Sequence, residues 1–328
     1  MSAGLSISVV IPTYRRPHDL HRALESLEQQ RRAPDETIVV DNAVDPVTEE
    51  ITRAHAARST AEVYYVAEPQ LGLHNARHAG ARKATGDVLV YTDDDATFAP
   101  NWLGAFARAF SEHPEMAAAG GAVLPDWEEP PPGWLLDLIE DETVFPPLSL
   151  ITDGDAFRLS PRGVFAGVNL AIRRDALFAL GGFNPDSFGQ RWFGDGESGL
   201  IRKLWGRNML IGFVPEATVY HYIQRSRMTK RYLRRRQVNE GAAVEYAVLR
   251  GRNPTVRLLL VRALRAAAGG FRATLVAGLA TVVARDATTG IRWQMRLSYF
   301  YGRLRYLWAV VRDTETRRYL RTDRWLTD

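Results

Sequence analysis

Short apolar runs alternate with amphipathic stretches through the first third of the chain. The apolar runs predict buried strands at Ser6–Pro12, Glu36–Asp41, Glu62–Ala67 and Asp87–Thr92. The stretches between and after them predict helices at Pro17–Gln30, Pro46–Ala57, Gly72–Ala84 and Asn101–Ser111. Repeated strand–helix units of this length predict an α/β fold with a mostly parallel sheet and right-handed crossovers. In such sheets, ligands bind beyond the carboxyl ends of the strands.

The pattern changes over residues 125–162. The run Glu128–Gly133 contains three consecutive prolines and cannot form the interior of a helix or strand. We therefore expect a loop or lid there. Regular structure resumes at Gly163–Arg173. It continues with a predicted helix near Gly196–Trp205 and predicted strands near Met209–Val214 and Thr218–Tyr222. From Arg225 onward the chain is predicted to be helical, which divides it into residues 1–224 and 225–328.

Charge follows the same division. Residues 225–328 hold 23 Lys/Arg and 7 Asp/Glu, a net charge of +16, whereas residues 1–224 hold 19 and 31, a net charge of −12. The basic part indicates a phosphate-rich partner, which could be an anionic membrane surface, a pyrophosphate lipid or a nucleic acid. A solvated helical face is the simpler alternative.

The residue composition limits the kinds of functional site that the chain can form. The hydrophobic fraction of 46% and the charged fraction of 24% are ordinary globular values for a chain of 328 residues. The absence of cysteine excludes disulfides, thiolate metal sites and a cysteine nucleophile, so any metal must bind oxygen or imidazole ligands. Neither a secretory signal nor an apolar run of about 18 residues is recognisable, and we therefore expect a cytoplasmic protein.

Three consecutive carboxylates, Asp93 to Asp95, follow the fourth predicted strand. Their mutual repulsion needs compensation, and a divalent cation bound to a diphosphate would supply it. In an extended or turn geometry Asp93 and Asp95 point to the same side, and hard oxygen ligands suit Mg²⁺ or Mn²⁺. A solvated acidic turn is the alternative.

Two further features carry candidate chemistry. Asp195 lies between two glycines, after Trp192 and before a predicted helix, a setting that suits a carboxylate accepting a proton near a sugar ring. It could equally be the N-cap of that helix. His221 lies among strand aromatics, where a single histidine is most often structural.

Taken together, these features resemble the inverting family 2 glycosyltransferases, which have a nucleotide-sugar-binding fold of the GT-A type. The resemblance covers residues 6 to about 224. The matching segments, in family order, are Ser8–Arg16, Val39–Asn42, Gly72–Gly80, Tyr91–Asp95, Gly167–Arg174, Gly181–Phe183, Gly194–Leu200 and Val214–His221.

The resemblance implies a role for each matching residue. The implied donor-binding residues are Pro12, Thr13, Tyr14, Arg16, Asp41, Arg77, Asp93 and Asp94. Among these, the first three would line the nucleoside pocket and Asp41 would read the base edge. Asp95 would bind the metal with Asp93 and His221. Asp195 would be the general base, and Trp192 and Glu197 would lie on the acceptor side. The family often has Glu-Asp where this chain has Gly194-Asp195, which leaves Asp195 as the natural base and makes Glu197 a weaker rival.

The implied reaction moves a sugar from a nucleoside-diphosphate sugar to an acceptor hydroxyl with inversion, assisted by Mg²⁺ or Mn²⁺. A lipid-linked or glycan acceptor is expected, in the synthesis of a cell-envelope glycan, a polysaccharide or a glycolipid. The basic helices would contact the inner face of the cell membrane, or another subunit in a homo-oligomer. A nucleic-acid-binding protein using these helices is the alternative from another class, and the carboxylate triplet does not favour it.

Overall fold

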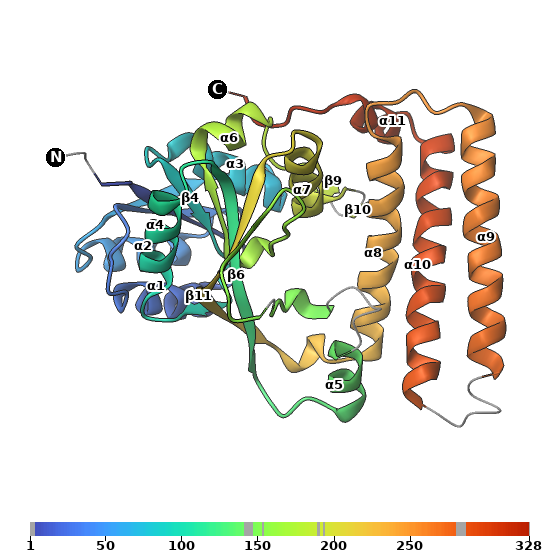
Figure 1. Cartoon of the computed structure of the whole chain (residues 1–328), viewed down its shortest axis with the longest axis horizontal. Coiled ribbons are helices and arrows are strands. Elements are labelled where there is room, and N and C mark those ends of the chain that lie inside the picture. The colour runs from blue at the N-terminus through green and yellow to red at the C-terminus, as the bar shows by residue number, and fades with distance from the viewer. Residues whose placement is uncertain are drawn as a thin grey trace.

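The computed structural model describes residues 4–140, 147–152, 154–188, 191–192, 194–279 and 287–327. Figure 1 shows two parts side by side: an α/β region, which contains the N-terminus, and a row of long helices formed by the last third of the chain. The predicted fold class is confirmed, since a sheet flanked by helices carries a helical C-terminal extension.

The main sheet has nine strands, with the order β3-β2-β1-β4-β8-β6-β11-β5 and β7 paired to β11. Its strands are β1 Ile7–Thr13, β2 Glu36–Asp41, β3 Glu62–Ala67, β4 Val88–Tyr91, β5 Ala96–Phe98, β6 Met116–Trp127, β7 Arg158–Ser160, β8 Leu170–Arg173 and β11 Leu210–Ile223. The first four strands are parallel, as predicted. Further along, β8, β5 and β7 run antiparallel to their neighbours, so the sheet as a whole is mixed.

Two layers of helices cover the sheet. These helices are α1 Pro17–Glu28, α2 Pro46–Ala56, α3 Leu73–Lys83, α4 Trp102–Glu112, α6 Arg174–Ala179 and α7 Gly196–Gly206. Successive residues of β1 point to opposite faces: Val9 belongs to the core under α1 and α4, and Val10 to the core under α3 and α7. Because β1 is buried on both faces, it appears in the sequence as a continuous apolar run.

The later predictions were less accurate. The two strands expected at Met209–Val214 and Thr218–Tyr222 are one strand, β11, whose pairing with β6 shifts register between Val214 and Val219. Within the expected loop, β6 continues to Trp127 and a short helix, α5 Gly133–Ile139, follows the prolines. A second, two-stranded sheet pairs β9 Ser187–Phe188 with β10 Arg191–Trp192.

The helical part consists of α8 Lys230–Leu249, α9 Val256–Leu279, α10 Ala287–Arg312 and α11 Thr314–Arg321. α10 lies between α8 and α9, and α9 is the outermost helix (Figure 1). The chain then returns to the α/β region, where the backbone N–H groups of Trp325 and Leu326 donate to the Gly181 carbonyl and Leu326 joins the core. The division at residue 224 stays a prediction, and Leu233, Ile291 and Met295 from beyond it join the core of the α/β region.

Glycines set the distance between α8 and α10. A Cβ atom on Gly302 would lie 2.0 Å from the Val238 carbonyl oxygen, whereas one on Gly270, in α9, would meet nothing closer than 3.5 Å. We expect Gly302→Ala to lower the free energy of unfolding by about 1–3 kcal/mol through overpacking. The matched Gly270→Ala should be neutral or stabilising by up to about 1 kcal/mol. Denaturant unfolding measures both; equal stabilities would contradict this packing.

Candidate active site

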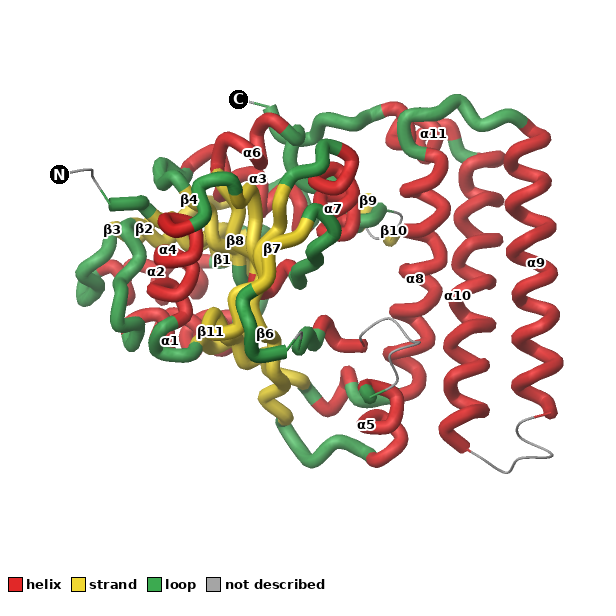
Figure 2. The backbone as a smooth tube through the Cα atoms, in the orientation of Figure 1, coloured by secondary structure: helices red, strands yellow, loops and turns green. Residues whose placement is uncertain are grey.

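A cleft of about 1330 Å³ opens between the carboxyl edge of the sheet and α8. The ends of β1 and β4 form one wall, and α7, β6 and α5 contribute others. Figure 2 shows α8 as the helix of the C-terminal row that stands nearest to the sheet. Many of the predicted site residues line it: Pro12, Thr13, Tyr14, Arg16, Asp93, Asp94, Asp95, Asp195, Glu197 and His221.

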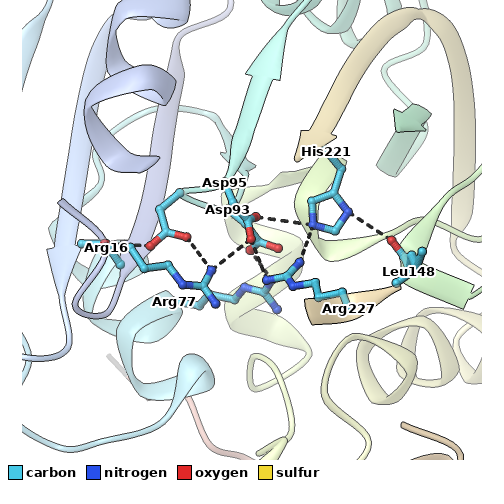
Figure 3. A network of polar contacts seen from close by, with 9 residues as sticks. Arg16, Arg77, Asp93, Asp95, Leu148, His221 and Arg227 are labelled. Atoms are coloured by element: carbon cyan, nitrogen blue, oxygen red, sulfur yellow. Dashed lines mark hydrogen bonds and ion pairs between the residues drawn. The ribbon is translucent and has the colours of Figure 1, made fainter. Parts of the chain in front are cut away.

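The aspartate triplet forms the centre of the site. Arg16 Nη1 bridges Asp94 Oδ1 at 3.1 Å and Asp95 Oδ2 at 3.0 Å (Figure 3). Thr13 Oγ1 donates to Asp94 Oδ2 at 2.8 Å. Burial raises the pKa of Asp94 to about 7, against the pull of Arg16. The triplet therefore does not carry three full negative charges at neutral pH.

Asp95 also contacts two residues from β11 and the turn after it. Arg227 Nη2 donates to Asp95 Oδ2 at 2.7 Å, and Arg227 Nη1 lies 3.1 Å from His221 Nε2. His221 Nδ1 lies 3.0 Å from the Leu148 carbonyl, which can only accept, so Nδ1 carries the proton and Nε2 presents a lone pair. Despite its burial, the pKa of Asp95 is held well below the usual range by the neighbouring cations of Arg227 and Arg16.

One oxygen in this cluster has no donor. Asp95 Oδ1 is buried without a hydrogen bond, and it lies 3.4 Å from the lone pair of His221 Nε2. A buried carboxylate oxygen beside an imidazole oriented by a backbone carbonyl fits a divalent cation. Among the described residues no three His, Asp or Glu side chains form a complete metal site. A cation there would need further ligands from a substrate.

Arg77 holds two acids from behind the cleft. Its fully buried guanidinium contacts Glu197 Oε1 at 2.7 Å and Asp93 Oδ1 at 3.4 Å, and it packs over the Phe183 ring. Arg77 is fully buried and does not line the cleft, so its predicted place among the donor-binding residues stays a prediction. Arg77 instead positions Asp93 and Glu197, which do line the cleft.

Asp41 is likewise buried away from the cleft. Its carboxylate accepts the backbone N–H groups of Ala43 at 2.8 Å and Asp45 at 2.6 Å, and the Tyr65 hydroxyl at 3.0 Å. These contacts shape the turn after β2. Its predicted contact with the base edge stays a prediction.

The two rival acids on α7 have different surroundings. Asp195 occupies the N-cap position, but its side chain makes no capping hydrogen bond. Its carboxylate is fully buried and accepts from Asn184 Nδ2 at 2.7 Å and Arg202 Nη1 at 2.9 Å. The Glu197 side chain is 33% exposed and lies in the cleft wall. The geometry therefore favours Glu197 for contact with an acceptor.

Sequence reasoning missed Asp186. It lines the cleft, is 7% exposed, and burial raises its pKa to about 7. Gly196 has φ +43°, and a Cβ atom there would lie 1.6 Å from Asp186 Oδ1. The glycine beside Asp195 thus makes room for the Asp186 carboxylate. The sequence feature that could have pointed to Asp186 is the Gly-Asp-Gly spacing at residues 194–196.

The helical part contributes to the same cleft. Arg227 comes from the turn before α8, and α8 adds Tyr232, Arg236, Glu240 and Ala243 to the lining. None of these was a predicted site residue, because nothing local marks them among the surrounding arginines. Trp192, predicted on the acceptor side, belongs to β10, but its side chain lies outside the described part of the chain.

Comparisons with known proteins identify the family. The sequence model described as "Glycosyl transferase family 2" matches residues 8–180. This is more than half of the chain, which therefore belongs to that family.

Two curated relatives are similar over part of their length. A glucosyl-dolichyl phosphate glucuronosyltransferase of Haloferax volcanii is 28% identical over 194 residues, covering 56% of this chain and 57% of the relative. The succinoglycan biosynthesis protein ExoM of Rhizobium meliloti is 25% identical over 245 residues, covering 72% and 73%. The match thus spans between about half and three quarters of these relatives.

Solved structures support the fold. The mannosyltransferase PcManGT from Pyrobaculum calidifontis, in complex with GDP-Man and Mn²⁺, superimposes with a TM-score of 0.62 at 20% identity. The superposition covers 94% of this chain and 88% of that one, so it includes most of the C-terminal helices. At this identity the likeness shows the fold alone.

Proposed function

We propose that this chain transfers a sugar from a nucleoside-diphosphate sugar to an acceptor hydroxyl, with inversion at the anomeric carbon. The observation that best supports this activity is the cleft at the carboxyl edge of the sheet. There, Asp95 Oδ1 is buried without a hydrogen bond, and the neighbouring His221 Nε2 lone pair accepts from Arg227, beside the cation of Arg16. This combination suits a diphosphate with its counter-ion.

The donor would lie along the ends of β1 and β4. Pro12, Thr13 and Tyr14 would line the nucleoside pocket. Asp95 and His221, with Asp93 nearby, would hold Mg²⁺ or Mn²⁺, which supplies positive charge to the departing diphosphate. GalNAc-T7, solved with UDP, GalNAc and Mn²⁺, and the mannosyltransferase, solved with GDP-Man and Mn²⁺, support this expectation. Arg16 and Arg227, which contact Asp95, would bind the phosphate oxygens in its place when the donor is bound.

The acceptor hydroxyl would be deprotonated by Glu197, with Asp195 as the alternative. The acceptor oxygen attacks the anomeric carbon on the face opposite the diphosphate, while the bond to the diphosphate oxygen breaks and its electron pair leaves with the nucleoside diphosphate. The acceptor proton goes to the carboxylate. Arg77 would fix the orientation of Glu197, because its guanidinium is immobilised by burial.

The acceptor would enter between α5, β6 and α8. The lining there combines apolar and charged side chains: Val123, Trp127, Leu136 and Ile139 with Arg236 and Glu240. This mixture supports a lipid-linked or glycan acceptor, as the name of the Haloferax relative indicates for that protein. We propose a role in the synthesis of a cell-envelope glycan, polysaccharide or glycolipid.

The proposed location is the inner face of the cell membrane. Within the described residues, no helix combines the length and hydropathy that crossing a bilayer requires. A peripheral contact through the basic helices accounts for their charge, and the family match does not favour the nucleic-acid-binding alternative.

The test is a panel of UDP- and GDP-hexoses and their nucleoside diphosphates, with Mn²⁺, Mg²⁺ or a chelator. A ligand at a hundred times its Kd should stabilise the fold by about 2.7 kcal/mol. We expect one nucleotide to raise Tm, more strongly with metal, and the matching sugar donor to be slowly hydrolysed to the same nucleotide. If no nucleotide changes Tm and no donor is consumed, the proposed function is wrong.

A further inference from the structure

Helix α9 presents an uncovered apolar ridge to the outside. Leu264 is 70% exposed and Phe271 68% exposed, although both are large apolar side chains. The ridge residues recur at spacings typical of one helical face and are Val256, Leu260, Leu264, Phe271, Leu275 and Leu279. Ala266 and Ala273, on the other side of the helix, are fully buried. At 1.5 Å per residue the ridge is about 36 Å long.

Arginines accompany this ridge without carboxylate partners. Arg257, Arg265 and Arg272 are exposed, and none of them pairs with an acidic side chain in the described part of the chain. The sequence of α9 contains no Asp or Glu. By contrast, Arg262 points inward and, with Arg303 of α10, contacts the fully buried Glu245 of α8. The inner arginines are neutralised, and the outer ones are available to a partner.

We propose that the α9 ridge docks onto an anionic lipid surface. The apolar side chains would enter the boundary between headgroups and acyl chains, and Arg257, Arg265 and Arg272 would contact lipid phosphates. The cleft stays open in this arrangement, because α9 lies on the far side of α10 from α8, which lines the cleft (Figure 1).

Charge argues against the two other occupants of this face. In a two-fold dimer through α9 the same arginines would face their own copies, with no acidic residue on the helix to compensate them. A nucleic acid would satisfy the arginines but would leave the leucines and Phe271 against phosphates and water. A lipid surface satisfies both sets of side chains.

The test is flotation of the full chain with vesicles of phosphatidylcholine alone or mixed with phosphatidylglycerol. Arg257→Gln/Arg265→Gln/Arg272→Gln should weaken binding to the anionic vesicles on the order of 100-fold, because each basic residue near such a surface contributes about fivefold, or about 1 kcal/mol. The matched control is Arg53→Gln/Arg58→Gln/Arg108→Gln, which removes the same charge from exposed positions of the α/β region and should bind like the wild type.

The apolar part is tested separately. Leu264→Ser/Phe271→Ser should weaken binding by at least about tenfold at both low and high salt, since insertion of apolar side chains is not screened. The arginine triple variant should lose mainly the salt-sensitive part, as the Debye length falls from about 10 Å at 0.1 M to about 3 Å at 1 M. Val47→Ser, an exposed apolar position on α2, is the control. The variants alter exposed side chains, and thermal unfolding verifies that they fold.

Three outcomes overturn the proposal. The wild type does not float with anionic vesicles at either salt concentration. Light scattering shows a dimer that Leu264→Ser/Phe271→Ser converts to a monomer without change in flotation, which assigns the ridge to a second copy. Alternatively, the arginine triple variant loses salt-dependent binding to DNA or RNA while flotation is unchanged, which assigns the arginines to a nucleic acid.

Discussion

Glu197→Gln is expected to lower kcat by about 10²–10⁴-fold, the usual contribution of a general base, while the Kd of the donor changes little. Glu197 lies in the cleft with one third of its side chain exposed, and Arg77 holds it in place. Asp195→Asn should have a smaller effect, because the Asp195 carboxylate is fully buried between Asn184 and Arg202. Initial rates with saturating donor, together with calorimetric donor binding, measure the two effects independently.

Two further measurements separate catalysis from structure. Glu216→Gln, an exposed acid on β11 outside the cleft, sets the background for removing one carboxylate. Thermal unfolding of each variant shows whether a fall in kcat comes from loss of the fold. If Asp195→Asn has the larger loss of kcat, Asp195 is the base, as the sequence indicated.

The sequence predicted the fold well where local pattern and burial coincide. β1, β2 and β4 are buried throughout because both faces of the sheet are covered there, whereas β3 at the edge is only partly buried. The triplet could be placed at the edge of the sheet because it follows β4 immediately. The later strands were predicted less well: β11 reads as two strands in the sequence because the bulge between Val214 and Val219 interrupts its pattern.

The site depends on contacts that no local pattern encodes. The choice between Asp195 and Glu197 follows from three partners, Asn184, Arg202 and Arg77, of which Arg77 lies 120 residues from Glu197. Arg227 is 132 residues from Asp95 and was counted among a basic tail. Total charge also could not separate Arg262, neutralised by Glu245, from the outward Arg265 of the same helix.

Asp95→Asn should weaken nucleotide binding in the presence of metal but not in its absence. With Mn²⁺, the affinity for the nucleoside diphosphate should fall at least about 100-fold, more than the 10–100-fold typical of losing a residue that only orients a metal ligand. With a chelator, affinity should stay equal or rise. The loss of the carboxylate's charge weakens its hold on Arg16 and Arg227, which become available to the diphosphate. Calorimetry with Mn²⁺ and with a chelator measures both nucleotide affinities in the same variant.

The neighbouring acid supplies the matched control. Asp94→Asn removes one carboxyl group from the same triplet, but the Asp94 oxygens are held by Thr13 and Arg16, so the metal-dependent part of binding should survive. Removing one partner of a buried ion pair costs about 3–5 kcal/mol. Thermal unfolding must therefore show that Asp95→Asn is folded at the assay temperature, and His221→Gln, which keeps the triplet intact, gives a second route to the same loss. Wild-type affinity that is equal with Mn²⁺ and with chelator would exclude a cation at Asp95. A fall in affinity of the same size under both conditions would mean that Asp95 orders the site without binding metal.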